Sequence, residues 1–201
     1  MRLQYILNLK YIKWLSYICA RKLQNIREET HQYRYLYYYG FQIIFGAANK
    51  ALLLLIFSLL FGIMKEAILV TVAFVALRIF AGGVHFDSYS LCAYASVSII
   101  LAAGFAAKYI SISYEVGIII FVLSLLAIII YAPAEHRNRP LCEREKAQFK
   151  IISIIVLILL YLVHNNSIMF GILLASLMVL PCAENLTRRI EKGLYKTKKL
   201  L

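Results

Sequence analysis

The run from Tyr114 to Ala132, YEVGIIIFVLSLLAIIIYA, decides the fold class because it is almost entirely apolar and has one charged residue, Glu115, near its start. About 20 helical residues, each rising about 1.5 Å, cross a hydrocarbon core of about 30 Å. Other apolar runs occupy residues 41–64, 67–81, 89–107, 149–164 and 167–183. The pattern predicts an all-α integral membrane protein with about six transmembrane helices, of which the second, 67–81, is short.

The composition agrees with a membrane protein. The 201 residues are 62% hydrophobic and have a mean hydropathy of +0.75, which leaves a soluble domain of this size too little polar surface. Four cysteines stand far apart without a CxxC pair, at Cys19, Cys92, Cys142 and Cys182. Neither a disulfide framework nor a zinc site is indicated, and we expect no metal and no cofactor.

The N-terminal segment, residues 1–40, is basic and amphipathic. Its apolar residues recur at helical spacing from Arg2 to about Gln24, which predicts a helix lying in the membrane interface with Trp14 as an anchor. The alternative is a helix packed on the cytoplasmic face of the protein itself. No uninterrupted apolar core precedes a cleavage site, so we expect the segment to remain on the protein. A tyrosine cluster at 33–39 suits the headgroup level.

The basic residues predict the orientation. All but four of the 22 lysines and arginines lie in residues 1–40, in 133–150 and in the tail after 183. Such residues accumulate on the cytoplasmic side. An even number of spans places all three segments there, so both termini are expected to be cytoplasmic. The predicted organisation is a segment 1–40, a six-span membrane domain 41–183 and a basic cytoplasmic tail 184–201, with the loop 82–88 also cytoplasmic.

Lys50 stands inside the first apolar run, beside Asn49. A lysine within the hydrocarbon is costly unless it is paired or faces water. Either Lys50 lines a polar cavity, or the span begins nearer residue 51 and the side chain reaches the interface.

Reactive side chains are concentrated between Arg78 and Cys92, in the sequence RIFAGGVHFDSYSLC. A cysteine with a histidine is the minimum set for a thiol nucleophile and its base. On one continuous helix His85 and Cys92 would be about 10.5 Å apart, too far for a hydrogen bond. Gly82-Gly83 and Asp87-Ser88 permit a turn. We therefore expect a span, a turn with His85, and a next helix with Cys92 in its first turn, where the helix N-terminus favours a thiolate.

Alternatives remain open on spacing alone. Arg78 can bring a positive charge to a substrate carbonyl or carboxylate, and backbone N–H groups near Gly83 can act as oxyanion donors. His85 and Cys92 also fit interfacial polarity and packing. Asp87 either orients His85 or caps the next helix. The competing function is a non-catalytic membrane peptide transporter or peptide-binding scaffold. A metal-dependent lipid enzyme lacks the clustered aspartates it needs, because Asp87 is the sole aspartate.

The stretch Arg78-Ile-Phe-Ala-Gly-Gly-Val-His85, with Cys92 seven residues later, resembles the core motif of the accessory gene regulator B (AgrB-like) membrane endopeptidases. The segment from Tyr131 to Glu135 with Arg139-Pro140 is similar to that family's second signature. The resemblance extends over almost the whole chain. It includes the chain length, the basic amphipathic N-terminal segment, the six expected spans and the basic tail.

The resemblance implies a multi-pass cysteine endopeptidase of a quorum-sensing system. Such a protein cleaves a membrane-associated (AgrD-like) precursor peptide on the cytoplasmic side through a cysteine thioester, and the peptide then closes to a thiolactone or lactone. By position, Cys92 is the nucleophile, His85 is its base, and Arg78 and Gly83 match positions that the family needs. The implied partners are the precursor, the lipid bilayer and a second copy in a homodimer, with no nucleic acid.

Overall fold

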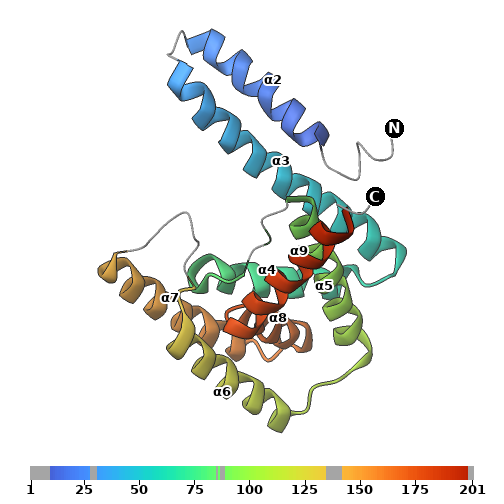
Figure 1. The fold of residues 1–201 in the computed structure, drawn as a ribbon. Helices are drawn as coiled ribbons and strands as arrows, with labels where there is room; N and C mark the ends of the chain where they lie inside the picture. The colour runs from blue at the N-terminus through green and yellow to red at the C-terminus, as the bar shows by residue number, and fades with distance from the viewer. Residues whose placement is uncertain (1–9, 28–30, 85, 87–88, 135–141, 199–201) are drawn as a thin grey trace. The chain divides into compact units, whose positions relative to one another are not determined.

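A computed structural model of the chain describes residues 10–27, 31–84, 86, 89–134 and 142–198. These residues are helical apart from turns, short links and one isolated β-bridge, with no β-strand among them (Figure 1). The all-α prediction is therefore confirmed for the described chain. The chain divides into two compact units: unit 1 is Met1–Phe57 with Ser88–Val97, and unit 2 is Ser58–Asp87 with Ser98–Leu201.

Unit 1 is built on a helical hairpin. Helix α2 (Lys10–Arg27) lies along the first half of α3 (His31–Leu60), as Figure 1 shows. Hydrogen bonds join Tyr11 to Asn49 and Arg34 to Tyr17, so the two helices run antiparallel. The face of α2 that packs inward repeats every four residues, which is the spacing of one helix face. Its buried residues are Ile12, Ser16, Ala20 and Gln24.

The outer face of α2 carries the residues on which the interfacial prediction depends. Trp14, Leu15 and Ile18 are exposed on it. The helix therefore packs on the protein through one face, as in the alternative interpretation, and also presents an apolar face outward. Helix α3 begins at His31, well before the expected residue 41, so the tyrosines at 33–39 lie within it.

Unit 2 has its core between α4 (Met64–Ala81) and α8 (Asn166–Leu177). The buried residues of α4 follow helical spacing and are Ala67, Val70, Ala73, Phe74, Leu77 and Ala81. The two helices approach closely at Gly171, where an added Cβ would lie 2.6 Å from the Cβ of Ala73 and 2.8 Å from the Val70 carbonyl oxygen. Small residues at a crossing permit such approach inside a membrane.

Polar side chains join the remaining helices of unit 2. Ser124 of α6 (Tyr114–Tyr131) donates a buried 3.0 Å hydrogen bond to Ser176 of α8. Lys150 of α7 (Glu143–Leu162) donates to the Ile129 carbonyl oxygen near the end of α6, at 2.9 Å. Asn166 binds the link that follows α5 (Tyr89–Tyr109).

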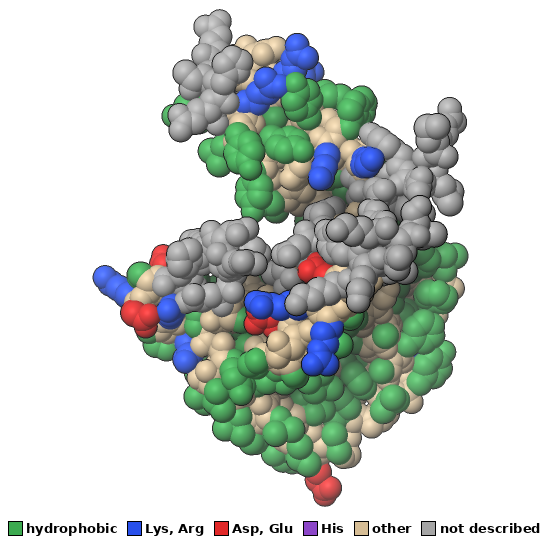
Figure 2. Space-filling model, in the orientation of Figure 1, with side chains coloured by type: hydrophobic (Ala, Val, Ile, Leu, Met, Phe, Trp, Pro, Cys, Tyr) green, Lys and Arg blue, Asp and Glu red, His purple; other side chains and the backbone are tan. Residues whose placement is uncertain are grey.

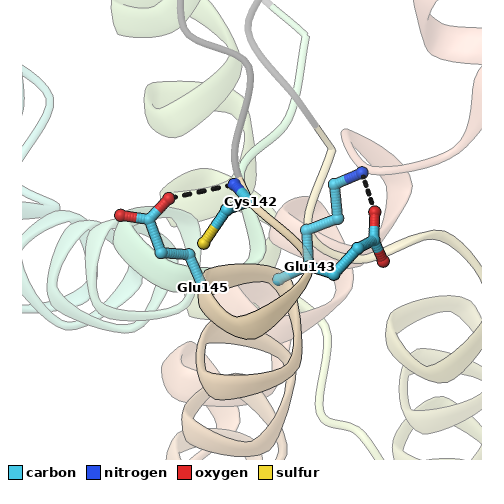
Figure 3. Close-up of polar contacts among 4 residues, drawn as sticks. Cys142, Glu143 and Glu145 are labelled. Atoms are coloured by element: carbon cyan, nitrogen blue, oxygen red, sulfur yellow. Dashed lines mark hydrogen bonds and ion pairs between the residues drawn. The ribbon is translucent and has the colours of Figure 1, made fainter.

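The N-terminus of α7 is capped by its own acidic residues, drawn in Figure 3. The Glu145 carboxylate accepts a 3.1 Å hydrogen bond from the Cys142 N–H, and Glu143 forms a 2.8 Å ion pair with Lys146. Acidic groups favour the positive end of a helix. Helix α7 therefore begins before the apolar run that was expected to start at 149.

The expected last span, 167–183, is not one straight helix. Helix α8 ends at Leu177, and the chain bends by 74° into α9 (Pro181–Lys198). Pro181 explains the end of α8, because a proline ring clashes with the carbonyl of the residue four positions earlier, which here is Leu177. The described part of the basic tail is helical, because α9 continues to Lys198.

Among the residues that the structure describes, three helices are long and apolar enough to cross a membrane: Tyr33–Leu60, Ser90–Tyr109 and Tyr114–Tyr131. The bent pair Asn166–Leu177 and Pro181–Glu191 brings the number to four if it forms one span. Exposed hydrophobic side chains cover much of unit 2 in Figure 2, while charged ones gather toward one border of the face shown. Exposure of so many apolar side chains to water would be unfavourable for a soluble protein. The chain is a membrane protein.

Candidate active site

The turn after α4 is shaped by two glycines with positive φ. Gly82 has φ 73° and ψ −149°, and Gly83 has φ 136°. L-residues with a Cβ rarely adopt these values. The Gly82 N–H donates a 3.1 Å hydrogen bond to the Arg78 carbonyl oxygen, which closes the last turn of the helix. The expected turn at the Gly pair is confirmed.

Two distant segments hold this turn. Gly82 and Ala134 form a parallel β-bridge, and the Ala134 N–H donates to the Ala81 carbonyl oxygen at 2.9 Å. On another side, the Val84 N–H donates to the Met178 carbonyl oxygen at 3.0 Å, just beyond α8. The segment 131–134, singled out in the sequence, therefore lies beside the Gly pair.

The Arg78 guanidinium faces the backbone of the same turn. Its Nη2 donates to the Val84 carbonyl oxygen, and its Cζ lies 5.3 Å from the centre of the Phe74 ring. A Cβ on Gly83 would lie 2.9 Å from Arg78 Nη1. Arg78 thus fixes the backbone immediately before His85, a role that the sequence did not predict.

Cys92 lies in unit 1, in the first turn of α5, which begins at Tyr89. The predicted placement of this cysteine is confirmed. Its side chain is half-buried, and its sulfur lies 4.0 Å from the Nζ of Lys50, which is half-buried as well. A neighbouring cation stabilises a thiolate, the reactive form of cysteine.

The contact with Cys92 decides between the two interpretations of Lys50. The candidate span Tyr33–Leu60 begins far before residue 51, so Lys50 lies in its interior. The residue before Lys50, Asn49, is polar as well, and its Oδ1 accepts a hydrogen bond from the Tyr11 hydroxyl. The Nδ2 of Asn49 is buried and finds no hydrogen-bond partner among the described residues. The polar-cavity interpretation is favoured over a lysine that reaches out to the interface.

Apolar residues fix the position of this polar group. Ile12 and Ala93, the neighbours of Tyr11 and Cys92, form a small buried cluster against which Tyr11 and Phe45 pack. Burial raises the pKa of the Tyr11 hydroxyl above its ordinary value of 10.0, and the neighbouring Tyr94 adds to this, so Tyr11 is a neutral hydroxyl donor at physiological pH. No local sequence pattern pairs Tyr11 with Asn49, because they lie on separate helices.

The remaining expected residues fall in two groups. His85, Asp87 and Glu135 lie outside the described residues, so the His85–Cys92 pair stays a prediction. Cys19, Cys92, Cys142 and Cys182 form no disulfide with one another. Within the described parts of the chain, no group of three or more His, Cys, Asp or Glu side chains is arranged to hold a metal ion.

Comparison with known proteins identifies the family. The model of the family described as Accessory gene regulator B matches residues 12–181. The chain belongs to the accessory gene regulator B family. The match includes the Gly turn, the segment 131–134, Lys50 and Cys92.

Individual relatives agree with this assignment. The chain is 28% identical over 169 residues to Accessory gene regulator protein B of Staphylococcus intermedius, covering 81% of this chain and 90% of that protein. It is 31% identical over 157 residues to Protein FsrB of Enterococcus faecalis, covering 74% of this chain and 65% of that protein. Putative AgrB-like protein 2 of Clostridium perfringens is 25% identical over 147 residues, covering 69% of each chain. No solved structure matches.

Proposed function

We propose that this protein is a membrane-embedded cysteine endopeptidase that processes a quorum-sensing precursor peptide and promotes its cyclisation. The observation that carries the proposal is the position of Cys92, half-buried in the first turn of α5 with the Lys50 ammonium 4.0 Å from its sulfur. A helix N-terminus and a cation both favour the thiolate. Membership of the accessory gene regulator B family supports a peptide precursor as the substrate.

The first step is cleavage with thioester formation. His85 takes the proton of the Cys92 thiol, and the thiolate attacks the carbonyl carbon of the scissile peptide bond. When the C–N bond breaks, the leaving amine takes the proton from the His85 imidazolium. The products are a C-terminal peptide and an N-terminal part bound to Cys92 as a thioester.

The second step closes the ring. A thiol or hydroxyl of the retained peptide loses its proton to His85 and attacks the thioester carbonyl, and the Cys92 sulfur leaves as a thiolate. Because both reacting groups belong to one bound peptide, their effective concentration is high and cyclisation outruns hydrolysis. Restricted access of water to the thioester acts in the same direction.

The turn before His85 needs to be rigid for both proton transfers. Arg78 supplies this by binding the Val84 carbonyl oxygen, and Gly83 leaves room for the guanidinium. The role we propose for Arg78 is therefore positioning of the turn. The role we propose for the Gly83 N–H is that of an oxyanion donor.

The proposed topology has six spans with both termini in the cytoplasm. The helices α4 and α7 and the bent pair α8–α9 join the three long apolar helices as the remaining spans. The basic segments then face the inner leaflet, where an amphipathic AgrD-like precursor would lie. Their charge attracts an acidic precursor tail. We also propose that the protein acts as a homodimer.

The test is cleavage of synthetic AgrD-like precursors by the full-length protein in liposomes, followed by mass spectrometry. We expect Cys92→Ala and His85→Ala to abolish release of the C-terminal peptide while both variants insert normally. Cys182→Ala serves as the control, because that exposed thiol lies at the start of α9 and has no role in the mechanism. Cleavage by Cys92→Ala would overturn the proposal, and peptide export without cleavage would favour a transporter or scaffold.

A further inference from the structure

The contact between Lys50 and Cys92 joins two parts of unit 1 that are distant in sequence. Lys50 comes from the interior of α3, and Cys92 comes from the first turn of α5. Their Nζ and Sγ atoms are 4.0 Å apart, and both side chains are half-buried. The sequence motif around His85 does not include this lysine.

Three helices fix the contact. Tyr11 of α2 binds Asn49, which precedes Lys50, and Ile12 packs against Ala93, which follows Cys92. Phe45, one turn before Asn49 on α3, packs against the same buried pair. Packing therefore holds the backbone on each side of the Lys50–Cys92 contact. The contact depends on this packing and not only on the length of the lysine side chain.

A charged lysine in the interior of a membrane-spanning helix is energetically unfavourable, and such residues are generally paired and functional. The candidate span Tyr33–Leu60 contains two charged residues, Arg34 near its start and Lys50 in its interior. The cost is offset when the ammonium faces an anion, and one group that it faces here is a thiol that becomes an anion on losing its proton. The low dielectric that makes the lysine costly also strengthens its attraction to a thiolate.

We propose that Lys50 is a catalytic residue that stabilises the thiolate of Cys92. The inference rests on the proposed function and deepens it. In the cleavage step the Lys50 ammonium favours the ionised nucleophile after His85 has accepted the proton. In the ring-closing step Cys92 leaves the thioester carbonyl as a thiolate, and the same ammonium stabilises the leaving group. Lys50 keeps its proton throughout, so it exchanges none with the substrate.

The experiment measures the thiolate without any substrate. The full-length protein in nanodiscs is treated with iodoacetamide at pH 7.5, and the alkylation rate of Cys92 is followed by mass spectrometry. Iodoacetamide is uncharged, so a change in local charge does not alter its approach. The exposed thiols Cys142 and Cys182 provide internal reference rates in every sample.

We expect Lys50→Met to slow alkylation of Cys92 by roughly tenfold relative to Cys182, because the thiolate that reacts loses its neighbouring cation. Lys50→Arg keeps the charge and should retain most of the rate. The matched control is Lys65→Met, which removes an exposed lysine from the first turn of α4 and should change nothing. If Lys50→Met does not fold, Lys50→Gln tests the same charge in a more polar side chain.

The outcomes separate this inference from the proposed function. An unchanged Cys92 rate in folded Lys50→Met or Lys50→Gln overturns the role of Lys50, even if the parent protein cleaves precursor and Cys92→Ala does not. A variant that reacts normally but binds precursor weakly would show that Lys50 contacts the peptide instead. Slower alkylation in a protein whose Cys92→Ala variant still cleaves precursor would refute the proposed function and leave the Lys50–Cys92 pair intact.

Discussion

Gly82 and Ala134 lie side by side in a parallel bridge, although they are far apart in the sequence. An added Cβ on Gly82 would overlap the Ala134 carbonyl oxygen and would lie 3.0 Å from the Ala134 nitrogen. The neighbours are backbone atoms, which cannot move aside as the end of a side chain can. The absence of a side chain at position 82 is therefore required for the turn before His85.

We expect Gly82→Ala to lower the stability of the protein and its cleavage activity together. A φ of 73° with a ψ of −149° is a conformation that essentially only glycine adopts, so a residue with a Cβ would be strained there by about 1–3 kcal/mol, and the overlap with Ala134 adds to this. Thermal unfolding in detergent and precursor cleavage provide the two measurements. Gly40→Ala is the control, because nothing lies within 4 Å of a Cβ at that helical position. Equal behaviour of the two variants would contradict the assignment.

Arg78→Lys should reduce the rate of cleavage more than the binding of precursor. Lysine keeps the charge, but it loses the planar group that reaches the Val84 carbonyl oxygen from above the Phe74 ring. A hydrogen bond from a charged donor contributes about 1.5–3 kcal/mol, so kcat should fall by about tenfold or more. Steady-state kinetics distinguish the roles. A raised KM with an unchanged kcat would instead mean that Arg78 holds the substrate.

The parts of this fold that were predictable depend on local signals. The two glycines predicted a turn because few residues adopt positive φ, and the start of α5 followed from the polar residues before Tyr89. The position of Cys92 in the first turn of α5 followed from these two signals together. His85 lies outside the described residues, so its distance from the thiol remains a prediction.

The features that were not predicted are of two kinds. Some depend on contacts between segments that are distant in the sequence, and the break after α8 depends on a single residue. The bridge between Gly82 and Ala134 and the Tyr11–Asn49 hydrogen bond have no local pattern. Lys50 was recognised as costly, yet its neighbour could not be named without the fold. The break after Leu177 had a local signal in Pro181, which the apolar character of the run concealed.

Gly171→Ala should destabilise the contact between α4 and α8. The added methyl would lie 2.6 Å from the Cβ of Ala73 and 2.8 Å from the Val70 carbonyl oxygen, so the helices would have to separate. Overpacking of this kind costs about 1–3 kcal/mol. The matched control is Gly117→Ala in α6, where the nearest atom is a Met169 side-chain carbon at 3.5 Å. Thermal unfolding in detergent should separate the two variants by several degrees, and equal melting temperatures would exclude a tight crossing at Gly171.

Glu143 should titrate below its ordinary pKa of 4.5, because its carboxylate accepts a hydrogen bond from Lys146 and faces that positive charge. A carboxyl group with a lowered pKa in the folded state stabilises that state at neutral pH. The contribution is lost as the pH falls through the folded pKa. NMR titration of the labelled carboxyl measures the shift directly. In Lys146→Met the midpoint should rise toward the ordinary value, and an unchanged midpoint would rule out the pair.

Asn166→Ala should loosen the link between α5 and α6 without affecting Cys92. The Asn166 side chain donates to the Ala107 and Ile110 carbonyl oxygens at 2.6 and 2.8 Å and accepts from the Ile112 N–H at 2.9 Å. Two of these bonds satisfy the end of α5, whose last carbonyls lack helical partners. Each hydrogen bond contributes about 0.5–1.5 kcal/mol, so the loss of all three should cost the variant about 1.5–4.5 kcal/mol of stability. Hydrogen exchange should then increase at Ile112 while the iodoacetamide rate of Cys92 stays at its parent value. Unchanged exchange at Ile112 would mean that the link is held by the backbone alone.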